Sequence, residues 1–163
     1  MHVFAGTVRD NLTIAAPGAS DHDIRAALEA TGATQVVDLL PDGLDTLVGS
    51  GGRQLTDAQA QQLALARLLL TDVELAILDE ATAEAGSSHA ATLDHGAAAA
   101  LRDRTGLVIA HRLSQAATCD RIVVMEHGRI IETGTHDDLL AAGGTYAGLW
   151  AAWESGRDLR SAG

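Results

Sequence analysis

The sequence of 163 residues predicts an α/β fold, with a mostly helical first part followed by a parallel sheet. Up to about Asp72, apolar residues recur at the spacing of helices joined by loops. After Asp72, short apolar strands alternate with a helical stretch, which is the pattern of a parallel sheet. We therefore expect one partial domain over residues 1–163, with residues 1–70 as a mostly helical subdomain and residues 71–163 as the sheet-containing part.

Two helices of the first part are marked by apolar residues that share one helical face. These residues are Ile24, Ala27 and Leu28, and later Leu63, Ala66 and Leu70. Between them, Pro41 and glycines at positions 43, 49, 51 and 52 are too dense for a regular element and predict an irregular connection. The second helix is expected to begin near Thr56, directly after that connection.

The second part is predicted to contain three strands, over residues 75–78, 107–110 and 122–125, with a helix around residues 90–102. Turn residues between two apolar runs over residues 125–131 predict a hairpin at the edge of the parallel sheet. Thr135 and Asp138 have the spacing of a capping box that begins another helix. Leucine and aromatic residues over 146–153 predict a last packed helix.

Composition excludes several classes of function. The formal net charge of -11 disfavours binding to nucleic acid or to anionic lipid surfaces, so no nucleic-acid partner is expected. The longest apolar runs are shorter than the roughly 18 residues of a membrane span, and the first ten residues lack a secretory signal. A cytoplasmic location follows, and the single cysteine, Cys119, excludes an internal disulfide and suits a reducing compartment.

The strongest local signal is an apolar strand that ends in two carboxylates, Asp79 and Glu80. Ligands of open α/β sheets bind where strands end. In a nucleotide site the first acid holds Mg²⁺ and the second polarises the water that attacks the terminal phosphate. The alternative for this pattern taken alone is a solvated strand end without a ligand.

A second buried-strand pattern ends at His111, thirty-one residues after Glu80. If the two strands are parallel neighbours, His111 lies beside Glu80, where an imidazole can bind both the carboxylate and a γ-phosphate. The alternative is an ordinary histidine with a satisfied side chain. We assign that alternative to the other six: His2, His22, His89, His95, His127 and His136.

Together, the stretches at residues 79–82, 110–114 and 134–136 resemble the ATPase domain of ATP-binding cassette (ABC) transporters of export type. The likeness extends over nearly all 163 residues, because residues 3–11 resemble the segment after the family's Q-loop and residues 40–49 the stretch ahead of its signature. The resemblance implies an incomplete P-loop NTPase (RecA-like) core, with ATP and Mg²⁺ as cofactors. It assigns Asp79 as the Walker B aspartate and metal ligand, Glu80 as the catalytic base and His111 as the switch histidine.

Two segments depart from the family pattern. The signature Leu-Ser-Gly-Gly-Gln appears as Leu55 followed by Thr56, Asp57, Ala58 and Gln59. In the family this loop contacts the γ-phosphate bound by the opposite subunit, so the lost glycines and the added negative charge indicate a degenerate signature. The alternative is that these residues only N-cap a core helix. The D-loop is likewise altered, to Ala83, Glu84, Ala85 and Gly86.

A third departure is the phosphate loop itself. All eleven basic residues other than histidine are arginines, so the chain lacks the lysine that a Walker A loop places on the β- and γ-phosphates. By resemblance, the Walker A loop, the aromatic that stacks on adenine and the Q-loop glutamine would all precede Met1. The sequence thus resembles the C-terminal portion of the domain, and the isolated chain is expected to bind ATP weakly or not at all.

The retained and altered elements predict a heterodimeric exporter. Residues that act in the chain's own site are kept, whereas the signature and D-loop, which face the partner, are altered. The expected partners are a second, different ABC ATPase subunit and a transmembrane domain, at the inner face of the cell membrane. Two alternatives stay open: a noncatalytic truncated cassette that acts as an interaction module, and an inactive gene fragment that folds poorly because its sheet edges are exposed.

Overall fold

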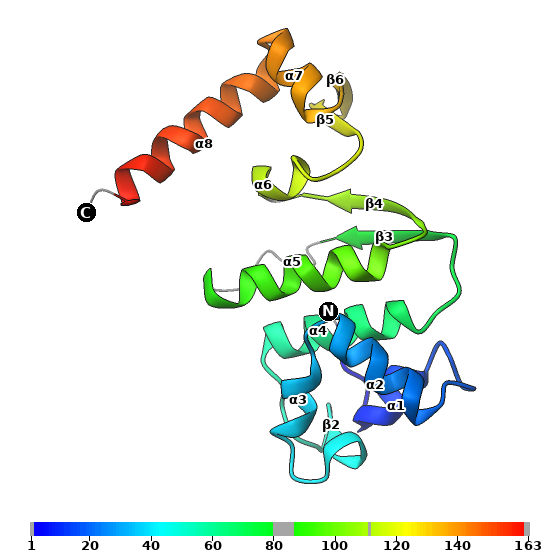
Figure 1. Ribbon diagram of the computed structural model, residues 1–163. Coiled ribbons are helices and arrows are strands. Elements are labelled where there is room, and N and C mark those ends of the chain that lie inside the picture. Colours follow the sequence, from blue (N-terminus) through cyan, green and yellow to red (C-terminus); the bar gives the residue numbers. More distant parts are fainter. Residues whose placement is uncertain (1, 80–86, 111, 162–163) are drawn as a thin grey trace. The chain divides into compact units, whose positions relative to one another are not determined.

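A computed structural model describes residues 2–79, 87–110 and 112–161 of the chain (Figure 1). It divides into two compact units, Met1–Ile109 and Ala110–Gly163. Helices and strands alternate in both units, and the first unit contains a parallel strand pair. The predicted α/β class is therefore confirmed.

The first part of the chain is mostly helical, as predicted. Its helices are α1 (Val8–Thr13), α2 (Asp21–Ala30), α3 (Thr34–Asp38), the 3-10 helix η1 (Gly43–Asp45) and α4 (Asp57–Leu69). Two short strands that the sequence did not predict, β1 (Gly6–Thr7) and β2 (Leu47–Val48), pair in antiparallel orientation. This pairing holds the first residues of the chain against the irregular connection that precedes α4.

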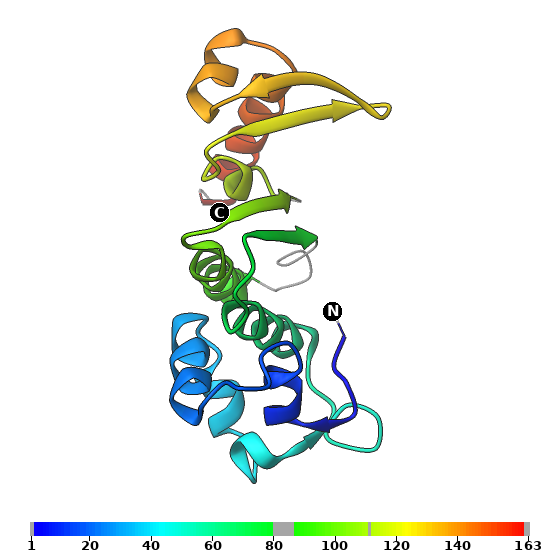
Figure 2. The same cartoon turned by 90° about the vertical axis from the view of Figure 1, so that its right-hand side faces the viewer.

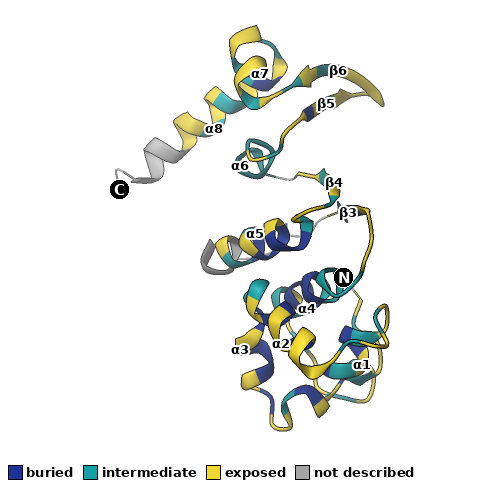
Figure 3. Cartoon of the chain, turned by 45° about the vertical axis from the view of Figure 1, so that its right-hand side comes forward, coloured by how far each residue is buried: buried dark blue, intermediate teal, exposed yellow. Residues whose placement is uncertain are grey.

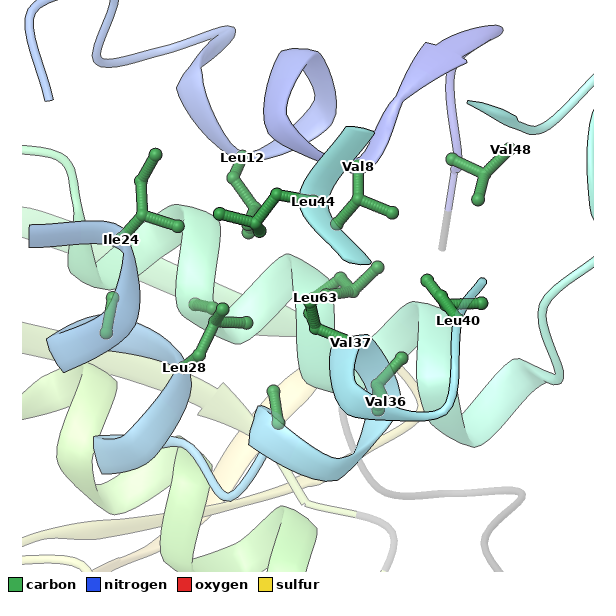
Figure 4. Packing of buried hydrophobic residues seen from close by; sticks show 13 residues of the cluster. Val8, Leu12, Ile24, Leu28, Val36, Val37, Leu40, Leu44, Val48 and Leu63 are labelled. Carbon is green, nitrogen blue, oxygen red and sulfur yellow. The ribbon is translucent and has the colours of Figure 1, made fainter. Parts of the chain in front are cut away.

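A hydrophobic core joins these helices (Figure 4). Its buried members come from α1, α2, α3, η1, β2 and α4 and from the connections next to α3, and the figure shows their side chains pointing into one common volume. The expected helical faces are confirmed, because Ile24, Leu28 and Leu63 are at most 3% exposed. Full burial of such an aliphatic side chain stabilises the fold by about 1.5–3 kcal/mol, so this core helps to hold α4 in place.

Capping boxes fix where four of the helices begin. Threonine or serine caps α1, α2, α4 and α7, and in each case a side chain three residues later binds back to the cap residue; the cap residues are Thr7, Ser20, Thr56 and Thr135. The sequence predicted the box at Thr135. In that box the bonds from the Thr135 hydroxyl and backbone N–H favour the charged form of Asp138 and lower the pKa of its carboxyl group.

The parallel sheet of the first unit consists of β3 (Leu75–Asp79) and β4 (Thr105–Ile109), connected through α5 (Ser87–Leu101). Both strands run in the same direction in the two views of Figures 1 and 2. Ala76 and Leu78 are buried, whereas Leu75 and Ile77 are exposed, so α4 and α5 cover one face only (Figure 3). The parallel register of β3 with β4 confirms the predicted pairing.

The second unit contains α6 (Leu113–Ala116), β5 (Ile122–Glu126), β6 (Arg129–Gly134), α7 (His136–Ala142) and α8 (Thr145–Ser161). The predicted hairpin is confirmed, and its turn residues His127 and Gly128 both have positive φ, as a tight two-residue hairpin turn requires. A small core of Ile122, Leu139 and Tyr146 joins the hairpin to α7 and α8.

The hairpin is a two-stranded antiparallel sheet within its own unit, where β5 pairs with β6. Its predicted place at the edge of the parallel sheet stays a prediction. Among the described residues, no helix is long and apolar enough to cross a membrane.

Candidate functional site

The strand pair β3–β4 places the predicted acid at an accessible edge. The hydrogen-bonded register pairs Leu75 with Thr105 and continues to Asp79 and Ile109, where both strands end. Asp79 is exposed. Because the strands are parallel, their carboxyl ends meet at one sheet edge, where ligands of α/β folds bind.

Two of the predicted catalytic residues adjoin these strand ends in sequence. Glu80 follows Asp79 directly, and His111 follows Ile109 by two positions. Both lie outside the described residues, as do the four D-loop residues Ala83, Glu84, Ala85 and Gly86. The parallel pairing on which their predicted contact depends is present, and the contact itself stays a prediction.

The strand end has the donor that a magnesium ion needs from protein. Within the described ranges, no group of three or more His, Cys, Asp or Glu side chains is arranged to hold a metal. Mg²⁺ is commonly bound by only one or two carboxylates, with water and phosphate oxygens completing its shell. An exposed carboxylate at Asp79 therefore fits Mg²⁺ that arrives with a nucleotide.

The altered signature forms the beginning of α4. Thr56 has extended backbone angles and caps the helix: its hydroxyl accepts a hydrogen bond from the Gln59 N–H (3.2 Å), and the Gln59 Oε1 atom accepts one from the Thr56 N–H (3.0 Å). Thus the structure shows the N-cap role that was one interpretation of this segment. Both polar side chains that could contact a phosphate are bonded to each other's backbone.

The charge at this helix end opposes an anion. Asp57 occupies the first turn of α4 and is exposed, while Ala58 follows it. A helix N-terminus attracts phosphate through its free N–H groups and its dipole. A carboxylate in the first turn already neutralises much of this positive electrostatic potential. The interpretation of residues 56–59 as a degenerate signature stays a prediction.

A network behind the signature was not predicted from sequence. Arg67, in the last turn of α4, donates from Nε to the Asn11 backbone oxygen (2.6 Å) and lies over the Phe4 ring, 5.4 Å from its centroid. The Asn11 side chain is 1% exposed and binds both the N–H and the carbonyl oxygen of Phe4. Burial lowers the pKa of Arg67. The sequence contained one indication of this network, which is the presence of an arginine within the apolar run 63–70.

Comparison with known proteins gives a consistent result. The chain matches the ABC transporter family over residues 2–83, which is 82 of its 163 residues. It is 47% identical over 150 residues to an ATP-dependent lipid A-core flippase of Ralstonia nicotianae, with 90% of this chain and 25% of that protein covered.

Two mycobacterial relatives are also similar. A multidrug efflux ATP-binding/permease protein of Mycobacterium tuberculosis is 43% identical, with 93% of this chain and 13% of that protein covered. The mycobactin import ATP-binding/permease protein IrtB of Mycolicibacterium thermoresistibile is 38% identical, with 92% and 26% covered. The chain thus spans about a quarter or less of the length of these curated relatives.

Proposed function

Because the chain belongs to the ABC transporter family, with the sequence of an export-type ATPase domain, we propose that it is part of the ATP-hydrolysing machinery of a membrane transporter. The observation that carries this proposal is the parallel strand pair that ends at Asp79, with Glu80 and His111 next in sequence. The Walker A loop, which this chain lacks, would come from another segment or another polypeptide.

The proposed division of labour follows from the chemistry of each side chain. Bound MgATP supplies a phosphoryl group whose charge is neutralised by the metal. The Asp79 carboxylate would hold Mg²⁺ at the strand end, and Glu80 would polarise the attacking water as general base. The imidazole of His111 would bind the γ-phosphate and the Glu80 carboxylate at once, so that it responds to loss of the phosphate.

We further propose that the partner ATPase is a different chain. Asp57 and Ala58, which replace the two glycines of the signature, and the altered D-loop all belong to elements that face the partner in this family. The ATP site completed by this chain's signature would then hydrolyse ATP poorly, while the site that contains Glu80 hydrolyses it. One competent and one degenerate site is the arrangement of a heterodimer.

A transmembrane domain is the other proposed partner, since several relatives are named ATP-binding/permease proteins. The chain would then lie on the cytoplasmic side of the membrane. Relatives named for efflux and for import match it at similar identity. Likeness to these relatives therefore does not distinguish export from import.

A chimera tests the proposal. The 150 aligned residues would replace the corresponding segment of the Ralstonia nicotianae relative, which brings the missing part of the domain. We expect a mixed dimer of the chimera with the unmodified relative, whose signature would complete the site that contains Glu80, to hydrolyse ATP. Glu80→Gln in the chimera should abolish that hydrolysis while leaving MgATP affinity unchanged. Glu126→Gln, at the end of β5, is the matched control and should leave activity intact. Equal activity of the Glu80 variant and the unmodified chimera would refute the assigned base.

A second candidate is a noncatalytic module that docks onto an intact cassette. The altered residues 56–59 and the absence of a phosphate-loop lysine from this sequence favour it. Copurification with an intact cassette subunit, with no effect of Glu80→Gln on the activity of the complex, would select this function. A cooperative thermal transition of the isolated chain would argue against the third interpretation, an inactive fragment that folds poorly.

A further inference from the structure

Arg104 joins the end of α4 to the beginning of β4. It follows α5 in the turn that leads into β4, and its guanidinium donates two hydrogen bonds to backbone carbonyls: Nη1 to Leu68 (3.0 Å) and Nη2 to Thr71 (3.2 Å). Leu68 belongs to the last turn of α4, and Thr71 to the connection that follows it. The carbonyls at a helix C-terminus lack helical partners, and a cation is favoured there.

The same turn also binds the other end of that connection. Residues 70–74 lead from α4 to β3, and the backbone N–H of Thr105 donates to the Glu74 oxygen (2.9 Å), one residue before β3 begins. Residues 104 and 105 therefore hold both ends of the five-residue connection. We call residues 70–74 the hinge, because α4 leads into it and β3 leads away from it (Figure 1).

Both elements carry their proposed functional residues at the ends far from the hinge. Thr56 caps the start of α4, and Asp79 ends β3. At 1.5 Å per residue the 13-residue helix is about 20 Å long, so an angular freedom of about 5° at the hinge would move Thr56 by about 2 Å. Packing of Leu65 against Leu78 restrains the same angle from the side of the core.

We propose that Arg104 is a positioning residue that fixes the angle between the signature helix and the strand that carries the metal ligand. Its functional consequence rests on the proposed function: the two ends serve opposite ATP sites, and both need sub-ångström placement. Arginine suits this role because its planar fork reaches two carbonyls at once, whereas a lysine ammonium on a flexible stem offers a single point charge.

Hydrogen exchange on the isolated chain tests the structural half of the proposal. In Arg104→Met we expect the amides of Leu70, Thr71 and Thr105 to exchange about tenfold faster or more, since two charge-assisted hydrogen bonds are lost. Arg102→Met is the matched control, because Arg102 is exposed and lies two residues earlier. Equal exchange in the two variants would overturn the proposal.

Activity of the chimera described above tests the functional half. Arg104→Met should lower kcat by about tenfold or more with little change in the KM for MgATP, Arg104→Lys should recover part of the loss, and Arg102→Met should match the parent. Faster exchange with unchanged kcat would make Arg104 merely structural and overturn the positioning role. An inactive parent chimera would count against the proposed function, while the exchange experiment still decides whether Arg104 fixes the hinge.

Discussion

Replacing Gly96 by alanine tests the close packing of α5 against the end of α2. Gly96 is buried, and a Cβ atom built on it would lie 2.9 Å from the Thr31 carbonyl oxygen and 3.2 Å from the Leu65 Cδ1 atom. The first neighbour is a backbone atom, so relief of the contact requires a shift of one helix end relative to the other. Glycine is thus needed here for space.

Two effects of opposite sign determine how much Gly96→Ala changes the free energy of unfolding. Alanine is favoured over glycine inside a helix by about 1 kcal/mol. Overpacking a well-packed core costs about 1–3 kcal/mol. The expected net result is a loss of about 0–2 kcal/mol in the free energy of unfolding, although alanine is the better helix former.

A matched variant in the same helix separates the two effects. Ala98 is exposed in α5, so Ala98→Gly reports the helix-propensity difference alone, expected as a loss of about 1 kcal/mol. Urea denaturation followed by circular dichroism gives both values. If Gly96→Ala stabilises the chain by as much as Ala98→Gly destabilises it, there is no steric cost, and the close approach of α5 to Thr31 is refuted.

Three further outcomes are expected. Asn11→Ala should lower the free energy of unfolding by about 1–3 kcal/mol, because the buried backbone groups of Phe4 lose their partner; denaturant titration measures this, and an unchanged midpoint would contradict it. Thr56→Ala should lower the free energy of unfolding by about 1 kcal/mol, and Thr56→Ser should lower it much less, since serine retains the cap. Equal losses of stability in thermal unfolding would exclude the capping role. The lowered pKa of Asp138 means that its ionised form stabilises the fold above about pH 4. That contribution disappears as the pH falls through the lower folded-state pKa. When the free energy of unfolding is measured from pH 5 downward, Asp138→Asn should therefore lose less stability than the parent, and parallel curves for the two proteins would contradict this.

Sequence periodicity was sufficient for much of the fold. Ile24 and Leu63 could be placed in the core because one helical face repeats every three or four residues, and this depends on local order alone. The parallel pairing of β3 with β4 followed from the strand–helix–strand order. The short strands β1 and β2 were missed because two-residue strands have no periodicity to detect.

The candidate site was predicted in part for the same reason. Asp79 could be placed at a strand end from the apolar run before it. Arg67 and Arg104, by contrast, bind backbone carbonyls of residues more than thirty positions away, and no local pattern encodes such partners.

A crystal structure of the chain that resolves Glu80 and His111 tests most directly whether a carboxylate and an imidazole lie side by side after the two parallel strands. The quantity to measure is the shortest distance between a ring nitrogen of His111 and a carboxylate oxygen of Glu80. We expect this distance to be within about 6 Å, the range in which the two groups affect each other's charge. A ring of His111 directed into the core, or placed at another sheet edge, would contradict the proposed site.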